Sequence, residues 1–159
     1  MKKTLMFAAT ITCLTLALIP AGYTSAREDN GKFPHIDSNG QFPPIRWVTN
    51  VRHTIQVHIP QNSSAISQLH LEVPYGLTVK DDIQVSTKSG QTIQTNTSIN
   101  GSKVVVTFLE PVTPGTKLIV ELNHVKRTKI TVPYSYRLSA NIVGSNVAIP
   151  IGVAYFRMY

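Results

Sequence analysis

The residue types that could carry out catalysis are few and widely spaced. The chain has eight Asp and Glu residues, five histidines and one cysteine. The adjacent carboxylates Asp81 and Asp82 would project to opposite faces of a strand, which makes them a poor acid–base couple. The sequence contains no G-x-S-x-G, S-x-x-K or H-E-x-x-H motif. We therefore predict that the protein is not an enzyme and uses no cofactor. A small hydrolase is the competing class, and it would require a buried histidine–carboxylate pair in a cleft.

The histidines do not form a recognisable metal motif. His58 and His70 fall on the outward-facing positions of successive predicted strands, so they could approach each other if those strands pair in one sheet. Two exposed imidazoles make a weak site, because a useful one needs three or four ligands. We predict no metal site, with a periplasmic metal-binding protein as an alternative function.

Basic residues are the first candidates for binding. The chain has a net charge of +7, and Lys126, Arg127 and Lys129 lie close together after a predicted hairpin. A basic exported protein meets anionic polymers and acidic proteins rather than nucleic acid. We therefore expect these three residues to contact an anionic envelope polysaccharide or another envelope protein.

Aromatic residues of the C-terminal segment are the second candidates. Tyr134 and Tyr136 share a parity with Leu138, which places them in the core. Tyr155 and Phe156 lie on opposite faces of the last strand, so one of the two is exposed, and exposed rings can stack on sugars. A polysaccharide-binding module that uses Tyr155 and Tyr159 is therefore an alternative function.

The first 26 residues have the features of a secretory signal peptide. Two lysines precede an apolar run, and small residues lead up to Ala26. We expect cleavage after Ala26, no transmembrane anchor in the mature protein and a secreted or periplasmic location. Cys13 would leave with the signal, so disulfides cannot stabilise the mature chain.

The rest of the chain divides into a leader and a β-domain. Residues 27–50 are rich in Pro, Gly, Asn and Asp without periodicity, and we expect an extended leader. Within it we expect Trp47 to be a plug at the domain edge, with a ligand platform as the alternative. From residue 51 to residue 159, apolar and polar residues alternate in short runs that end at prolines. Roughly eight such runs predict a monomeric, immunoglobulin-like antiparallel β-sandwich.

One stretch carries the clearest local prediction. Val104–Asn123 alternates with a period of two on both sides of Pro114-Gly115. Proline suits the first central position of a type II turn, and glycine accepts the positive φ of the second. The pattern predicts two strands joined as a hairpin.

Several segments occur together in an order that extends beyond local patterning. They are the strand HTIQVHIP, the strand QLHLEVP, the stretch TFLEPVTPGTKLIVEL, the Tyr-rich YSYRLSA and the ending IPIGVAYFRMY. In these segments the chain, from His53 onward, resembles a cyanobacterial family of exported proteins known only as a domain of unknown function. The resemblance implies a β-rich fold and export in a photosynthetic bacterium. It assigns no activity and no catalytic residue. The chain departs from these relatives at residues 124–133, where they carry an Asn-Pro and Gly turn.

From the signal peptide, the absence of catalytic motifs and the strand pattern, we predict an exported, non-enzymatic structural or binding module of the bacterial cell envelope.

Overall fold

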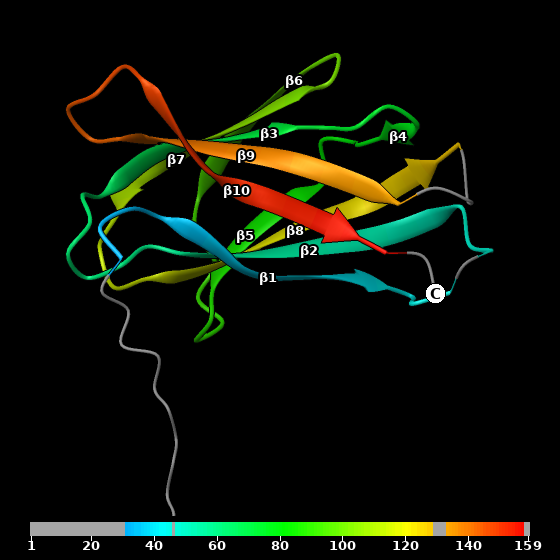
Figure 1. Ribbon diagram of the computed structural model, residues 1–159, viewed down its shortest axis with the longest axis horizontal. Helices are drawn as coiled ribbons and strands as arrows, with labels where there is room; N and C mark the ends of the chain where they lie inside the picture. The colour runs from blue at the N-terminus through cyan, green and yellow to red at the C-terminus, as the bar shows by residue number, and fades with distance from the viewer. Residues whose placement is uncertain (1–30, 46, 129–132, 158–159) are drawn as a thin grey trace, which may run out of the picture.

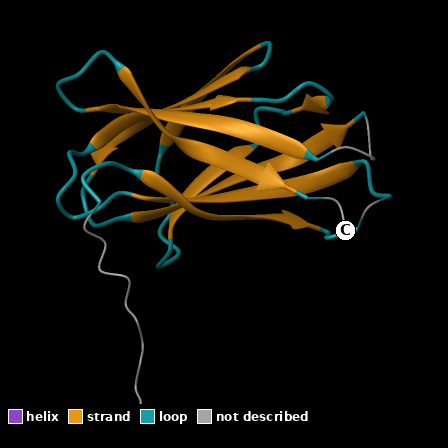
Figure 2. Cartoon of the chain, in the orientation of Figure 1, coloured by secondary structure: helices purple, strands orange, loops and turns teal. Residues whose placement is uncertain are grey.

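A computed structural model describes residues 31–45, 47–128 and 133–157. The expected signal peptide, Lys129 and Tyr159 lie outside these residues. Within them the chain forms an all-β sandwich of two antiparallel sheets (Figure 1). Figure 2 shows strands joined by loops, with no helix in the described part of the chain. The described residues accordingly offer no helix that is long and apolar enough to cross a membrane.

The first sheet has five strands, of which β8 is the common partner. β8 pairs with β2 on one side, and with both β4 and β5 on the other, while β1 extends the sheet beyond β2. The strands are β1 (His35–Phe42), β2 (Asn50–His58), β4 (Leu77–Thr78), β5 (Ile83–Thr87) and β8 (Lys117–Arg127).

The second sheet also has five strands, in the order β10-β9-β3-β7-β6. The strands are β3 (Ile66–Glu72), β6 (Thr95–Asn100), β7 (Lys103–Val112), β9 (Tyr134–Ile142) and β10 (Ala148–Phe156). The edge strands β1 and β10 of the two sheets lie side by side (Figure 1), and the Asn39 side chain donates to the Tyr155 carbonyl across that edge.

The core lies between the two sheets and follows the predicted alternation. Ile55, Val57, Leu69 and Leu71 are fully or almost fully buried, whereas the polar residues between them face outward. Tyr136 is also fully buried, which confirms the parity argument for the Tyr-rich strand. Burial of one face of each sheet is the main source of stability in such a sandwich.

Two expectations about the strands are corrected. Residues 27–50 were expected to be an extended leader, but His35–Phe42 is the edge strand β1, paired with β2 through backbone hydrogen bonds. Val104–Asn123 is not a hairpin, because β7 and β8 belong to different sheets. The turn itself is confirmed, since Gly115 has a φ of 78°. The turn carries the chain from β7 in the second sheet to β8 in the first. It is held against the first sheet by the Gly115 N–H, which donates to the carbonyl of Ile59 after β2.

Candidate functional site

A β-bulge in β8 decides which basic side chains reach the surface. Leu118, Val120 and Leu122 face the core, and continued alternation would turn Arg127 outward. Between Leu122 and Val125, however, β8 has one residue more than β2 has opposite it. His124 in this bulge has a φ of 54°. An extra residue reverses the parity of everything after it, so Val125 and Arg127 turn inward.

Arg127 is therefore not a surface contact, which corrects its predicted role. Its side chain is 2% exposed, whereas the adjacent Lys126 is exposed. Of the three residues predicted to bind an anionic polymer, only Lys126 is placed on the surface, and Lys129 lies outside the described residues. Burial lowers the pKa of Arg127, while the neighbouring Tyr134 raises it. A guanidinium remains charged under all physiological conditions, so this cation must be solvated by protein groups.

The solvating groups belong to the connection between β1 and β2. Nη2 of Arg127 donates to the carbonyl of Ile45 at 3.1 Å and also to the carbonyl of Val48. Its backbone N–H donates to the carbonyl of Thr49, and Nη1 donates to Oε1 of Gln41 at 3.2 Å. Arg127 thus holds the connection at Ile45, Val48 and Thr49.

A buried polar network continues from Arg127 into the core. Gln41 Oε1 also faces Nε2 of His53 at 3.4 Å, and Nδ1 of His53 faces the Tyr136 hydroxyl at 2.8 Å. The Phe156 ring stacks on the His53 ring at 4.1 Å. Burial, and to a smaller extent the Arg127 charge, lowers the pKa of His53 to about 3. Burial raises the pKa of Tyr136 above its ordinary value. The network joins both sheets, and its histidine is neutral at physiological pH.

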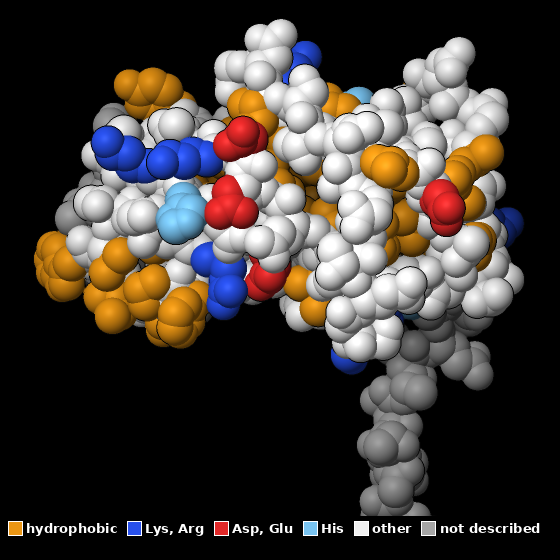
Figure 3. All heavy atoms as spheres, turned by 180° about the vertical axis from the view of Figure 1, so that it is seen from behind, with side chains coloured by type: hydrophobic (Ala, Val, Ile, Leu, Met, Phe, Trp, Pro, Cys, Tyr) orange, Lys and Arg blue, Asp and Glu red, His pale blue; other side chains and the backbone are white. Residues whose placement is uncertain are grey.

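The end of β1 and the connection from β1 to β2 expose large apolar side chains. Phe42 is 61% exposed, Ile45 is 49% exposed and Trp47 is 71% exposed. We call these three residues the aromatic end. Trp47 is thus not the edge plug that the sequence suggested. Figure 3 shows hydrophobic side chains gathered on the left, at the end where the β1–β2 connection lies. The backbone bonds to Arg127 explain how the connection holds its shape although its large side chains face solvent.

Polar and charged side chains border the aromatic end. The Arg52 guanidinium lies 5.6 Å from the centre of the Phe42 ring and 3.6 Å from Glu121. His124 faces Asp82 at 3.5 Å. Acidic and basic groups therefore alternate here, as Figure 3 shows. Because the acidic groups offset the basic ones, charge alone gives this surface little selectivity for anions.

Of the two neighbouring tail aromatics Tyr155 and Phe156, one faces solvent and the other faces the core. Tyr155 is 64% exposed, whereas the alternate residue Phe156 is buried. Tyr155 thus remains available to a ligand, and Tyr159 lies outside the described residues.

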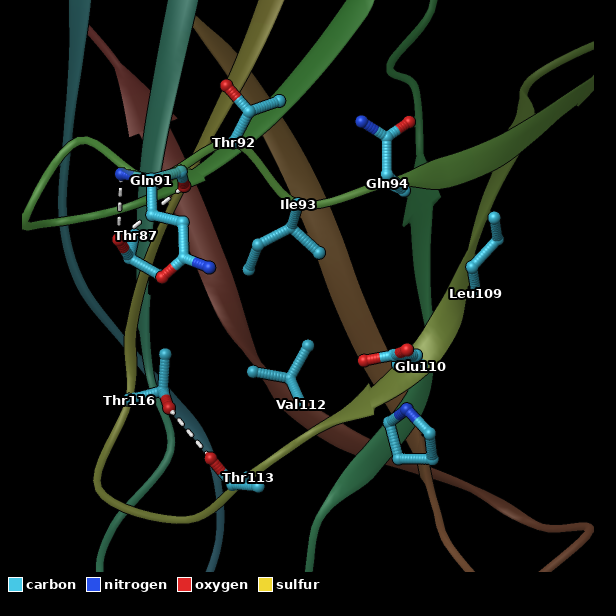
Figure 4. Close-up of a pocket in the computed structure, with 11 residues that line it drawn as sticks. Thr87, Gln91, Thr92, Ile93, Gln94, Leu109, Glu110, Val112, Thr113 and Thr116 are labelled. Carbon is cyan, nitrogen blue, oxygen red and sulfur yellow. Dashed lines mark hydrogen bonds between the residues drawn. The ribbon is translucent and has the colours of Figure 1, made fainter.

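A separate groove of about 510 Å³ lies where the chain crosses between the sheets (Figure 4). Thr87, Gln91, Gln94, Thr113 and Thr116 contribute hydroxyl and amide groups to its lining, with Ile93 and Val112 between them. Its lining includes the carboxylate of Glu110 and neither a basic nor an aromatic side chain. An acidic groove without a stacking surface suits an anionic polymer or a sugar ring less well than the aromatic end does.

The histidines are arranged differently from the prediction. His58 is on β2 and His70 on β3, so the two lie in different sheets. His58 instead meets His35 and Asp37 of β1, and one ligand atom from each of these three lies within 4.8 Å of the others. The sequence indicated no grouping of histidines, but the structure brings His35 and His58 together around Asp37. The buried His53 has Tyr136 and Gln41 as its hydrogen-bond partners. This is not the histidine–carboxylate pair that a hydrolase would need.

The fold places the chain among immunoglobulin-like β-sandwiches. No family model matches it, and no curated protein matches it. Among solved structures it is similar to the N-terminal domain of the Streptococcus gordonii adhesin Sgo0707, with a TM-score of 0.53 and 12% identity. It is also similar to a variant of BcpA, the major pilin subunit of Bacillus cereus, with a TM-score of 0.50 and 15% identity. Each match covers 77% of this chain, but only 32% of the adhesin chain and 38% of the pilin chain. At these identities the likeness establishes the fold alone.

Proposed function

We propose that the protein is an exported, non-enzymatic binding module of the bacterial cell envelope that binds polysaccharide through the aromatic end. One observation carries the proposal. Phe42 at the end of β1 and Trp47 in the following connection are large rings exposed by 61% and 71%, and the buried Arg127 fixes that connection to the core. A contiguous exposed apolar patch often marks an interaction surface or a ligand-binding site. The adhesin and pilin neighbours share the fold and are compatible with such a role.

The chemistry of the aromatic end suits a sugar chain. One face of a pyranose ring presents C–H groups that pack on an indole or phenyl ring, while the hydroxyl groups around its edge need hydrogen-bond partners. Asn50, Arg52 and Lys126 supply such partners beside Phe42, because Phe42 pairs with Arg52 and Asn50 pairs with Lys126 in the sheet. Since Arg127 anchors the connection before any ligand arrives, binding loses little conformational entropy.

The charged neighbours determine which polysaccharides bind best. Arg52 and Lys126 attract uronate or phosphate groups, but Glu121 lies only 3.6 Å from Arg52 and reduces that attraction. Each exposed ion pair contributes only about 0–1 kcal/mol and is screened by salt. We therefore expect the stacking rings to supply most of the affinity, and the two cations to add a salt-sensitive preference for acidic polymers.

Co-sedimentation with insoluble cell-wall polysaccharide, acidic and neutral, tests the proposal at low salt and at about 0.5 M salt. Trp47→Ser and Phe42→Ser should each lose most retention on both polymers, and Lys126→Gln should lose only the salt-sensitive part on the acidic one. Leu109→Ser is the matched control, because Leu109 is 58% exposed and lies on β7. Unchanged retention in the Trp47 and Phe42 variants, with loss in Tyr155→Ser, would transfer the function to the tail.

A further inference from the structure

The cluster of His35, Asp37 and His58 lies at the end of the first sheet that is remote from the aromatic end. His35 pairs with His58, and His58 pairs with Lys117. His35, His58 and Lys117 therefore form a row across β1, β2 and β8. Asp37 is the extra residue of a β-bulge between Ile36 and Ser38. A bulge re-aims the side chain that it carries, and here it brings the Asp37 carboxylate to both imidazoles.

From this geometry we propose that His35, Asp37 and His58 form a binding site for a divalent first-row metal ion, with Zn²⁺ as the expected ion. The proposal is independent of polysaccharide binding, because the two sites share no residue.

The distances suit one small cation between the three side chains. Asp37 Oδ1 lies 3.5 Å from Nε2 of His35 and 3.9 Å from Nδ1 of His58. Two ligands that each lie about 2.0–2.2 Å from a tetrahedral zinc ion are about 3.4 Å apart. Small side-chain rotations would therefore bring the three atoms to coordination distance. Two imidazoles and one carboxylate leave a fourth position for water or an external ligand.

The partners of the cluster orient its ligand atoms. Nδ1 of His35 lies 3.3 Å from the carbonyl of Phe33, which favours a proton on Nδ1 and a lone pair on Nε2. Nε2 then faces Oδ1 of Asp37 at 3.5 Å, so one cation can bind both atoms. Lys117 Nζ donates to Oδ2 of Asp37 at 2.8 Å. The other carboxylate oxygen, Oδ1, is the one that faces the two histidines.

Two features set the expected strength. The side chains of His35, Asp37 and His58 are 40%, 26% and 11% exposed, so an ion can enter from solvent. The Lys117 charge opposes a second cation nearby. We therefore expect a site that binds one ion reversibly, more weakly than a four-ligand structural zinc site.

Calorimetric titration of metal-free protein without a histidine tag tests the proposal with ZnCl2, and Co²⁺ absorption reports the coordination. We expect one Zn²⁺ per chain, four-coordinate Co²⁺ bands, and affinity reduced by about tenfold or more in His35→Gln and in His58→Gln. His124→Gln is the matched control, because His124 also lies 3.5 Å from a carboxylate but outside the cluster.

The metal-free thermal midpoints of all variants show whether each one folds. If a His58 variant fails to fold, His35→Gln on the more exposed edge strand gives the decisive comparison. Absence of stoichiometric binding, or equal loss in His124→Gln, would overturn the proposal.

Discussion

Arg127 and Lys126 are adjacent basic residues with opposite roles. Lys126 is exposed to solvent, whereas Arg127 is buried and donates to the carbonyls of Ile45 and Val48. The bulge at His124 separates the two roles, because it reverses which side of β8 each side chain occupies. The affinity proposed for the aromatic end thus depends on an arginine that does not contact the ligand.

We expect Arg127→Met to lower the free energy of unfolding by about 2–4 kcal/mol, because it removes the donor to the carbonyls of Ile45 and Val48 and leaves them unsatisfied. Chemical denaturation measures the change. Lys126→Met is the control and should stay within about 0.5 kcal/mol of the parent. Equal stability of the two variants would show that Arg127 does not anchor the connection.

His53 makes the stability pH-dependent in a defined direction. Its pKa is about 3 in the folded chain against an ordinary 6.5, so the folded state binds fewer protons. The stabilisation is complete above pH 6.5 and is lost as pH falls from there toward 3. Between pH 7 and pH 5 the free energy of unfolding should drop by about 2 kcal/mol.

Denaturant titration in the presence of a chelator tests this expectation. His53→Phe should flatten the profile in that range, because it keeps an aromatic ring against Phe156 but cannot titrate. His70→Gln, on the outer face of the other sheet, should retain the drop. A parent profile that is flat from pH 7 to pH 5 would contradict a buried neutral His53.

Residue roles were only partly predictable from the sequence. The burial of His53 was accessible, because it shares the parity of the apolar residues Ile55 and Val57 in an alternating run. The burial of Arg127 was not, since nothing in the local pattern marks the bulge before it. The cluster of His35 with His58 was also not predictable. It depends on pairing between β1 and β2, and residues 27–50 lack the alternation of apolar and polar residues that would indicate a strand there.

At the scale of elements, the β7–β8 connection shows what a turn motif can and cannot determine. Pro114-Gly115 forms the expected turn with positive φ at Gly115. A Cβ at Gly115 would meet only the Oε1 end of Gln61, an exposed and flexible side chain that can rotate away, so the positive φ is the main constraint at this position. This constraint holds whether the flanking strands pair with each other or, as here, enter opposite sheets.

Gly115→Val should therefore lower the free energy of unfolding by about 1–3 kcal/mol, and Gly115→Asn by clearly less, because Asn tolerates positive φ. Denaturant midpoints of the two variants measure the difference. Adding Gln61→Ala to Gly115→Val should recover little of the loss, because the exposed Gln61 side chain can already rotate away from the new Cβ. Equal midpoints for the Val and Asn variants would contradict a strained φ at this position.

Strand positions were more predictable than strand partners. Alternation is a local property of the chain, so Ile55, Leu69, Val85 and Tyr136 could be assigned to the core correctly. Partner choice depends on contacts between distant segments, and the sequence carries no local signal for it. Strand β1 illustrates the limit, because its HIDSNGQF segment is polar and depends on backbone pairing with β2 and contact with β10.

At the scale of the whole molecule, the first sheet presents different chemistry at its two ends. The aromatic end lies where Phe42 pairs with Arg52, and the proposed metal site lies where His35 pairs with His58. The same two strands carry both sites, separated by the length of β1. Loss of one site should therefore leave the other intact, provided that β1 stays paired to β2.

The protein should be a monomer in solution, because the aromatic end is too small to hold two chains together. Its three side chains are 61%, 49% and 71% exposed, which corresponds to about 400 Å² of surface. A stable interface needs about 800 Å² from each partner. Light scattering over a dilution series should therefore give the mass of one chain throughout, for the parent and for Trp47→Ser alike. A parent dimer that dissociates in Trp47→Ser would make the aromatic end a self-association surface. The polysaccharide assay would then have to show that sugar displaces the second copy.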